Sequence, residues 1–223
     1  MAAGFDLLAP HYRWMEWLLA GRKLQRCRTA FLGQLPQPRR TLLLGEGNGR
    51  FLAELLRRHP RTKFTCVDSS LRMLECLRIR LARLNLDTAA GEFVHADALD
   101  WSPPADRHDL IVSHFFLDCF RPDQLARLVP ALARSAVPDA RWLLADFCEP
   151  PVGWTRWRAR AILWSMYLFF RAAARLPAAR LTAPDDLLRH AGFALVERRS
   201  FDWGLLHSDL WSNAGNNSHK TAC

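Results

Sequence analysis

The sequence predicts an α/β protein in which helices cover both faces of a seven-stranded, mostly parallel sheet. Three observations favour this fold. Short apolar segments of strand length alternate with segments of helical apolar spacing along most of the 223 residues, which is the pattern of strand–helix–strand units. A glycine-rich turn follows the first apolar segment, at residues 41–44, and Asp68 ends the second. An acidic residue about 20 positions after such a turn is typical of doubly wound nucleotide-binding folds.

The first half of the chain supplies four strands. Residues 5–31 have helical apolar spacing, which Pro10 interrupts early, and Pro36-Gln37-Pro38 forms a linker. The strands are apolar runs too short for a helix, whereas the helical segments repeat their apolar residues every three or four positions. We expect strands at 41–44, 63–67, 92–95 and 109–114, helices at 50–58 and 71–84, and a proline-containing loop at 101–107.

The second half continues the alternation and then changes it. A short helix opens at Pro184-Asp185-Asp186, since proline and carboxylates are favoured in a first turn, and it stops at Gly192. The last two strands follow each other without a helix between them, so we expect an antiparallel hairpin around Asp202-Trp203-Gly204. The remaining elements are a helix at 122–136, a strand at 141–147, a helix at 154–176, and the two final strands at 194–201 and 205–211.

Composition indicates one globular domain with additions at its ends. Half of the residues are hydrophobic, and a chain of this length can bury a single large α/β core. We expect an N-terminal helical cap at residues 1–35, the main domain at 41–211 and a flexible tail at 212–223.

Cysteines and apolar runs bear on the compartment. The six cysteines show no C-x-x-C pairing, so neither a metal site nor a disulfide framework is expected, and a reducing compartment is favoured. Charged residues interrupt the amino-terminal segment, so no signal peptide is expected. The longest apolar run, 161–170, is ten residues long, whereas a membrane-spanning helix needs about 20. These features predict a cytoplasmic protein.

The chain is strongly basic, with a formal net charge of +9. Only Lys23, Lys63 and Lys220 are lysines, and the other basic residues are arginines spread along the whole chain. A basic surface attracts polyanions without identifying a target. Because the arginines form no single tract, nucleic acid is the disfavoured class of substrate.

The glycine-rich turn reads Gly45-Glu46-Gly47-Asn48-Gly49. A dinucleotide fingerprint needs G-x-G-x-x-G, in which the third glycine packs the helix on the strand. That third place holds Arg50 or Leu52 here, depending on which glycine is counted first, so a nicotinamide-dependent reductase is disfavoured. The G-x-G-x-G turn together with Asp68 resembles the first two motifs of the class I methyltransferases that use S-adenosylmethionine (SAM), which have a Rossmann-like fold.

The resemblance covers residues 5 to 147 and implies roles for individual residues. The loop glycines lie along the methionine part of SAM, Asp68 accepts hydrogen bonds from both ribose hydroxyls, and Asp97 binds the adenine amino group. Met73 packs on adenine, although a helix-core position explains it equally well. The opening segment up to Tyr12 is similar to methyltransferases of ubiquinone and menaquinone biosynthesis, in which it folds over the cofactor. The cofactor-binding residues implied are Tyr12, Gly45, Glu46, Gly47, Asn48, Gly49, Asp68, Ser69, Met73, Asp97, Ala98 and Ser113.

One position departs from the family. An acidic residue usually stands two places before the first glycine, where it helps to hold the methionine ammonium, and this chain has Leu43 there. Glu46, inside the loop, is the expected substitute, and the alternative is that it is a solvated loop residue. Leu43 also leaves open a non-catalytic SAM-binding protein on the same fold.

Residues that follow the fourth strand face the sulfonium and the acceptor in this family. Methyl transfer needs mainly in-line positioning, and a base only where the nucleophile must lose a proton. His114, with an ordinary pKa near 6.5, and Asp118 are the candidate bases, and a packing role for His114 is an equal alternative. Methyltransferases that act on the nitrogen of a base or an amide carry an Asn/Asp-Pro-Pro-Phe/Tyr-type motif after the fourth strand. This chain lacks that motif after its fourth predicted strand, which argues against an RNA substrate.

Tryptophan and arginine gather in the segment 154–176. A core helix with solvated arginines is the simplest interpretation; a lid over a hydrophobic acceptor and a helix resting on an anionic membrane are the alternatives. In the lid interpretation, Trp164 and Tyr167 wall a pocket beside His114. The sequence thus predicts methyl transfer from SAM to a small, apolar or aromatic acceptor, with an RNA methyltransferase or a non-catalytic SAM-binding protein as alternatives. No metal is expected, and no signal for an oligomeric state is present.

Overall fold

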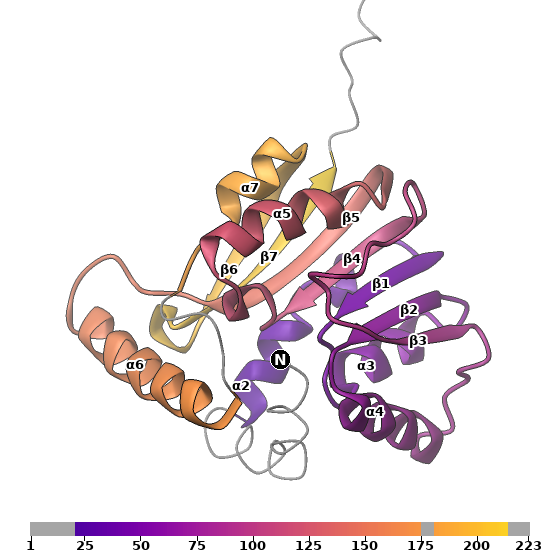
Figure 1. Cartoon of the computed structure of the whole chain (residues 1–223), viewed down its shortest axis with the longest axis horizontal. Helices are drawn as coiled ribbons and strands as arrows, with labels where there is room; N and C mark the ends of the chain where they lie inside the picture. The colour runs from indigo at the N-terminus through magenta and orange to yellow at the C-terminus, as the bar shows by residue number, and fades with distance from the viewer. Residues whose placement is uncertain (1–20, 175–180, 214–223) are drawn as a thin grey trace, which may run out of the picture.

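A computed structural model describes residues 21–174 and 181–213, and it contains the predicted seven-stranded sheet (Figure 1). The strand order is β3-β2-β1-β4-β5-β7-β6. Neighbouring strands are parallel, except that β7 runs antiparallel to both β5 and β6. The predicted fold class is therefore confirmed. The strands are β1 Arg40–Leu44, β2 Lys63–Asp68, β3 Gly91–His95, β4 His108–His114, β5 Ala136–Phe147, β6 Phe193–Phe201 and β7 Leu206–Asn213.

Helices cover both faces of this sheet (Figure 1). On one face, α3 and α4 pack side chains such as Leu77 against Leu43 of β1. On the other face, α5 and α7 pack Leu125 and Leu188 against Trp142 of β5. The helices are α2 Gly21–Arg28, α3 Arg50–Arg58, α4 Leu71–Arg83, α5 Pro122–Ala133, α6 Trp154–Ala174 and α7 Asp185–His190, with single 3₁₀ turns η1 Leu32–Gln34, η2 Leu117–Cys119 and η3 Asp202–Gly204.

The strand β5 begins five residues earlier than the sequence predicted, at Ala136, and α5 correspondingly ends at Ala133. The sequence did not predict this part of the strand because it contains Pro138 and Asp139. Proline and a residue with positive φ are both rare inside strands. Asp139 has φ 64°, and the pairing of β5 with β4 shifts register between His108 and Leu110. The irregularity is a bulge at the edge of the pairing, which accommodates both residues.

The ends of the chain differ from expectation in a smaller way. Of the expected helix at 5–31, the structure describes α2, which ends at Arg28, and the turn η1 that follows it. Residues 1–20 and 214–223 lie outside the described part. The strand β7 continues to Asn213, so the first two residues of the expected tail belong to the sheet.

Candidate active site

The segments that follow β1 to β4 meet at the carboxyl-end edge of the sheet, because these strands are parallel and adjacent. They enclose a cavity of about 100 Å³. Such an edge is where open α/β sheets bind their ligands. Residues implied by the motif resemblance form much of the lining: Gly45, Gly47, Asp68, Ser69, Met73, Asp97 and Ala98. The rest of the lining is Val67, Ala96, Phe115, Phe116, Cys119 and Phe120.

The three glycines of the turn have different structural roles. Gly45 and Gly47 line the cavity, and their φ angles of 59° and 64° lie in the left-handed region that favours glycine. Gly49 lies behind the cavity at the start of α3, and a Cβ placed there would come within 2.8 Å of Leu77 Cγ. Gly49 therefore permits α3 to pack on α4, and the structure gives it no contact with the cavity.

Asp68 lies at the end of β2 and begins the turn into α4. One of its carboxylate oxygens accepts a hydrogen bond from Ser70 N at 2.9 Å. The Ser70 hydroxyl in turn accepts one from Met73 N at 3.2 Å and so caps α4. This local bonding fixes Asp68, Ser69 and Met73 side by side on the cavity wall.

Asp97 and Ala98 follow β3, the strand next to β2, and also line the cavity. The Asp97 carboxylate accepts a hydrogen bond from Leu99 N at 3.0 Å, which closes a tight turn. Ala98 is buried, so this wall is apolar apart from the Asp97 carboxylate and the backbone.

Glu46 reaches towards α3. Its Oε1 accepts hydrogen bonds from Phe51 N at 2.8 Å and Leu52 N at 2.9 Å. These are first-turn amides that have no acceptor within the helix, and a carboxylate at this end also complements the helix dipole. Glu46 is therefore a helix-capping residue, which excludes the alternative of a purely solvated side chain. Its role towards a methionine ammonium stays a prediction.

Two residues implied to bind the cofactor lie elsewhere. Ser113 is fully buried, and its hydroxyl accepts a hydrogen bond from Trp142 Nε1 at 2.8 Å between β4 and β5. Asn48 is buried, and its backbone carbonyl accepts a hydrogen bond from Arg80 Nε at 2.6 Å. Neither residue lines the cavity, and their role towards the cofactor stays a prediction. Tyr12 lies outside the described residues.

His114 is a buried residue at the end of β4. Its ring packs edge-on against Phe51, with 4.6 Å between the centroids, and neither ring nitrogen has a hydrogen-bond partner in the described part of the chain. Burial lowers the pKa of His114 well below its ordinary value, and the nearby Arg28 lowers it further. His114 is therefore neutral at physiological pH and lies behind the cavity wall.

Asp118 and Asp146 form a buried carboxyl pair next to the cavity. Asp118 N donates a hydrogen bond to Asp146 Oδ2 at 3.2 Å, and the two side chains are also hydrogen-bonded to each other. Burial raises the pKa of Asp118 to about 6, and burial together with the Asp118 charge raises the pKa of Asp146. Cys119, which lines the cavity, donates to Asp118 Oδ1 at 3.5 Å.

Sequence reasoning found Asp118 and missed Asp146. The sequence did contain a signal for Asp146, because this carboxylate lies within the last two residues of the strand predicted at 141–147. Asp68 was identified from a similar position at the end of β2. Asp146 was overlooked because the surrounding segment reads as an ordinary apolar strand.

The cavity fits SAM in its chemistry and is narrower than the whole cofactor needs. Asp68 and Asp97 place two carboxylates in a largely apolar wall, and carboxylates are the acceptors that the predicted contacts to ribose hydroxyls and an adenine amino group require. The volume is below the roughly 300–1,000 Å³ typical of small-ligand pockets. The Phe116 ring lies directly against Gly45, where a Cβ would collide with it. Phe116 therefore narrows the cavity beside the glycine turn.

None of the α6 side chains that the structure describes lines the cavity. Trp154, Trp157 and Trp164 are largely exposed. The interpretation of 154–176 as a core helix is therefore wrong for these tryptophans, and Trp164 does not wall a pocket beside His114. The side chain of Tyr167 lies outside what the structure describes.

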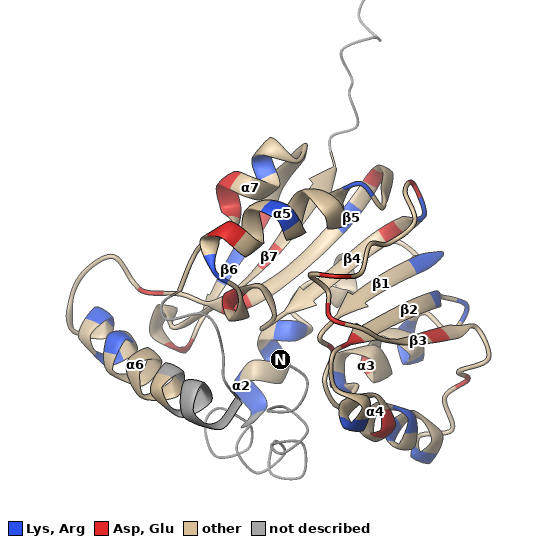
Figure 2. Cartoon of the chain, viewed as in Figure 1, with Lys and Arg blue, Asp and Glu red and all other residues tan. Residues whose placement is uncertain are grey.

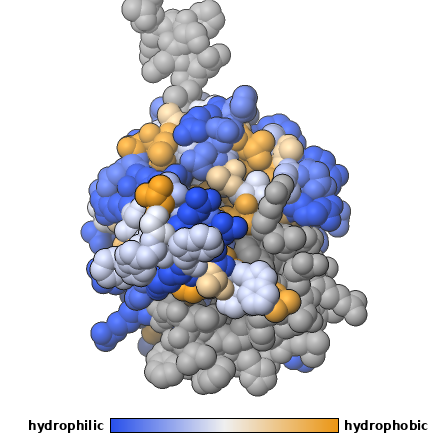
Figure 3. All heavy atoms as spheres, turned by 90° about the vertical axis from the view of Figure 1, so that its left-hand side faces the viewer, coloured by the Kyte–Doolittle hydropathy of each residue, from blue (hydrophilic) through white to orange (hydrophobic). Residues whose placement is uncertain are grey.

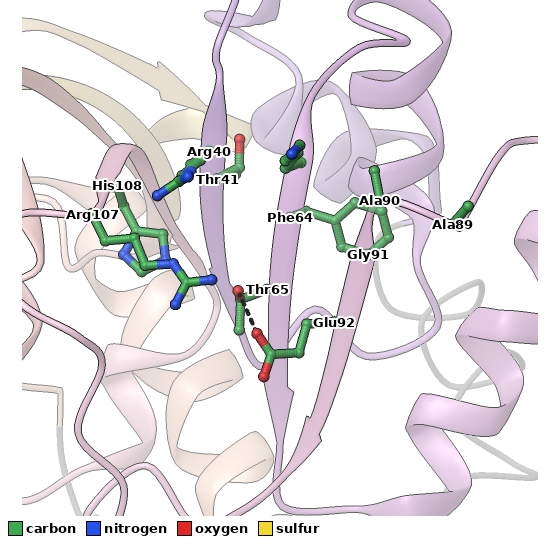
Figure 4. A pocket seen from close by; sticks show the side chains of 11 residues that line it. Arg40, Thr41, Phe64, Thr65, Ala89, Ala90, Gly91, Glu92, Arg107 and His108 are labelled. Atoms are coloured by element: carbon green, nitrogen blue, oxygen red, sulfur yellow. Dashed lines mark hydrogen bonds between the residues drawn. The ribbon is translucent and has the colours of Figure 1, made fainter.

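A second, larger cavity of about 330 Å³ lies at the amino-terminal ends of the strands, at the opposite edge of the sheet (Figure 4). Arg40, Lys63, Arg107 and His108 line it, and Thr65 Oγ1 donates to Glu92 at 3.3 Å within it. None of the residues implied by the motif resemblance takes part. This cavity is therefore separate from the candidate active site.

A family model described as a methyltransferase domain matches residues 42–139. The match runs from β1 into the start of β5 and so includes the glycine turn and every residue of the cavity lining named above. No curated protein matches the chain in sequence.

Solved structures match the fold. The apo structure of the SAM-dependent methyltransferase SibL has a TM-score of 0.67 at 22% identity, covering 92% of this chain and 58% of that one. An O-methyltransferase family 2 protein from Planctomyces limnophilus DSM 3776, in complex with apigenin, has a TM-score of 0.66 at 18% identity, covering 93% and 60%. The N-methyltransferase NodS from Bradyrhizobium japonicum WM9 has a TM-score of 0.56 at 15% identity, covering 87% and 94%.

The chain spans less than two thirds of the length of SibL and of the Planctomyces protein. At these identities the structural likeness shows the fold.

Proposed function

We propose that this chain, whose residues 42–139 match a methyltransferase domain and whose fold matches that of SAM-dependent methyltransferases, transfers the SAM methyl group to a small apolar or aromatic acceptor. The single observation that carries the proposal is the convergence of Gly45, Gly47, Asp68 and Asp97 on one cavity at the carboxyl-end edge of the sheet.

The character of the acceptor is inferred from the cavity wall. Phe115, Phe116 and Phe120 line the cavity together with the residues assigned to SAM. Aromatic side chains exclude water and favour flat or apolar molecules. Among the matching structures, one holds apigenin and another is an N-methyltransferase, so the proposal leaves the accepting atom open.

An RNA acceptor has weaker support. Polynucleotide binding needs a track of cations that follows the phosphate backbone. In Figure 2, Lys and Arg are scattered over several helices and strand ends and do not gather on one segment. Among the described residues, those that line the cavity include no Lys or Arg.

We assign the proton-accepting role, where the acceptor has a proton to lose, to the Asp118–Asp146 pair. A base works best when its pKa lies near the working pH, and the pKa of Asp118 is raised to about 6. His114 is a weaker base because burial and Arg28 lower its pKa. The methyl group itself needs no activation by the protein, so the remaining task is to hold donor and acceptor in line.

Turnover with methyl-labelled SAM tests this function. Label should pass into small molecules of a cell extract and not into bulk RNA. Asp68→Ala should weaken SAM binding by about 1.5–3 kcal/mol, the scale of a charge-assisted hydrogen bond. Asp100→Ala is the matched control, because Asp100 is exposed and outside the cavity lining. Label in RNA alone would overturn the acceptor assignment, and unchanged SAM affinity in folded Asp68→Ala would overturn the site.

A further inference from the structure

The outer face of α6 is apolar and turned to solvent. It consists of Trp154, Trp157, Ala161, Trp164 and Leu168, which follow one another at helical spacings of three and four residues. The four large side chains are 63%, 72%, 70% and 55% exposed, in that order. Large apolar side chains gathered in one patch are uncommon on a soluble surface and mark an interaction site. Figure 3 views the molecule from the side on which α6 lies.

The inner face of α6 already has its packing partners. Ala159 and Leu163 are buried against Leu24, Leu205 and Leu206. The helix therefore rests on the body through one face and leaves the other without a partner among the described residues. Burial in the core does not explain the tryptophans.

Neighbouring segments extend the outer face. Trp203 of η3 is 69% exposed, and its ring lies 5.9 Å from that of Trp154. Val152, just before α6, is also largely exposed. The patch thus combines two segments that lie far apart in the sequence.

The charge beside this face is positive. The helix α6 contains four arginines and no Asp or Glu. Arg156 pairs with Glu149 at 2.8 Å, and Arg158 pairs with Asp202 at 3.0 Å. Arg160 is 3.9 Å from Glu149, which Arg156 already occupies, and its guanidinium lies 5.7 Å from the Trp157 ring centroid. The cations outnumber the carboxylates that face them, so a negatively charged surface complements the patch.

We propose that the outer face of α6, with Trp203, docks on the surface of an anionic lipid bilayer, the helix lying in the plane of the interface. Tryptophan is enriched at the boundary between lipid and water, where its amphipathic ring is favoured. An apolar stripe flanked by arginines is the pattern of interfacial helices. Among the described residues, no helix is both long enough and apolar enough to cross the bilayer.

A second copy of the chain fits this face less well. It would present the same flanking arginines, Arg158 and Arg160, and α6 carries no carboxylate to pair with them across such an interface. Facing arginines would repel each other, and a lipid phosphate surface would not.

Docking would orient the candidate active site. The helix α6 follows the carboxyl end of β5, and η3 precedes Leu206, which pairs with Phe147 at that same end. The patch and the cavity therefore share one edge of the sheet (Figure 1). This consequence rests on the proposed function: an apolar acceptor dissolved in lipid would reach the cavity directly. The docking itself does not depend on methyl transfer.

Vesicle co-sedimentation of the full chain tests the proposal. We expect binding to vesicles of phosphatidylcholine with phosphatidylglycerol, and weaker binding to phosphatidylcholine alone. Trp157→Ala combined with Trp164→Ala should weaken binding roughly tenfold or more, since each ring loses apolar contact with the interface. Both residues are exposed, so the variant should keep its thermal unfolding midpoint and its SAM affinity, which separates this test from that of the proposed function.

Two controls use other parts of the surface. Ile79→Ala removes an exposed apolar side chain of α4, and Lys63→Gln removes a cation from the opposite edge of the sheet. Neither should change vesicle binding. Absence of vesicle binding by the wild type would overturn the proposal, as would equal binding by the tryptophan variant. If the wild type did not bind vesicles but formed a dimer in sedimentation equilibrium, and the tryptophan variant were a monomer, the face would be assigned to a second copy of the chain instead.

Discussion

Among single residues, the pair Asp118–Asp146 has the most direct chemical consequence. Two carboxyl groups in contact and away from water cannot both ionise without a large cost, so they hold one proton between them over a wide pH range. A singly ionised pair is a base in its own right. Its buried negative charge also lowers the stability of the folded protein.

Replacing Asp118 by Asn separates these two effects. Asn keeps a side chain of the same shape that can still donate to Asp146. We expect turnover to fall by about 10²-fold or more for an acceptor that must lose a proton, while the folded state at pH 7.5 becomes more stable by about 1–3 kcal/mol. Urea unfolding and labelled-SAM turnover measure the two outcomes.

The sign of the stability effect follows from the raised pKa. The folded state of the wild type holds the Asp118 proton more tightly than the unfolded state, whose Asp pKa is about 3.9. The wild type is therefore favoured below that value and loses stability as the pH rises towards about 6. The advantage of Asp118→Asn should appear over this range and persist above it. A variant that is less stable than the wild type at pH 7.5 would contradict the buried charge. Asp123→Asn, at an exposed Asp whose pKa Arg121 lowers, should give no stabilisation.

The sequence was sufficient to predict the cavity residues that are recognised by residue type and by spacing along the chain. Gly45, Gly47, Asp68 and Asp97 could be found because their places after successive strands are fixed by the order of elements. The direction of the Ser113 hydroxyl could not be predicted in this way. Whether a hydroxyl at a strand end faces a cavity or a buried indole depends on Trp142, which is distant in sequence and adjacent only in the folded sheet.

At the scale of elements, the hairpin of β6 and β7 depends on a buried charge pair. Asp209 is fully buried, and Arg198 donates to both of its carboxylate oxygens, at 2.7 and 2.6 Å. His207 contacts the same carboxylate at 3.0 Å. Burial alone would raise the pKa of Asp209, and the hydrogen bonds from Arg198 and His207 outweigh it and hold that pKa below its ordinary value.

Arg198→Ala should therefore destabilise the protein by about 3–5 kcal/mol, because it leaves a buried carboxylate without its main partner. Arg189→Ala is the control. It removes an arginine of similar sequence position whose partner Asp186 is exposed, and it should change stability by less than about 0.5 kcal/mol. Urea midpoints compare the two, and equal midpoints would show that Asp209 does not need Arg198.

The sequence predicted helices and strands correctly where local residues determine where they begin and end. It was wrong where pairing with another strand determines this. The glycine turn, the helix caps and the hairpin around Asp202-Trp203-Gly204 are local signals, and the corresponding elements occur in the structure. The start of β5 at Ala136 is imposed by pairing with His108. That partner overrides the local preference of Pro138 and Asp139 against a strand.

For the molecule as a whole, cofactor binding should be visible as stability. A ligand at about 100 times its dissociation constant adds about 2.7 kcal/mol to the folded state. For a chain of this size, that corresponds to a rise of roughly 5–10 °C in the unfolding midpoint. We expect this rise with SAM and with its demethylated product. NADH at the same concentration should give no shift, because the glycine turn lacks the dinucleotide register. A shift with NADH alone would contradict the cofactor assignment.

The position of β7 between β5 and β6 has a consequence for how the protein is made. A ribosome releases β6 before β7, yet β6 pairs in the sheet only with β7. During synthesis, β6 therefore lacks its native partner strand, and the Trp211 side chain, which is fully buried in the finished core, is still missing. The nascent sheet ends at an open β5 edge until β7 emerges. Folding of this half therefore waits for β7, and the exposed β5 edge is the surface that a chaperone would have to shield in the interval.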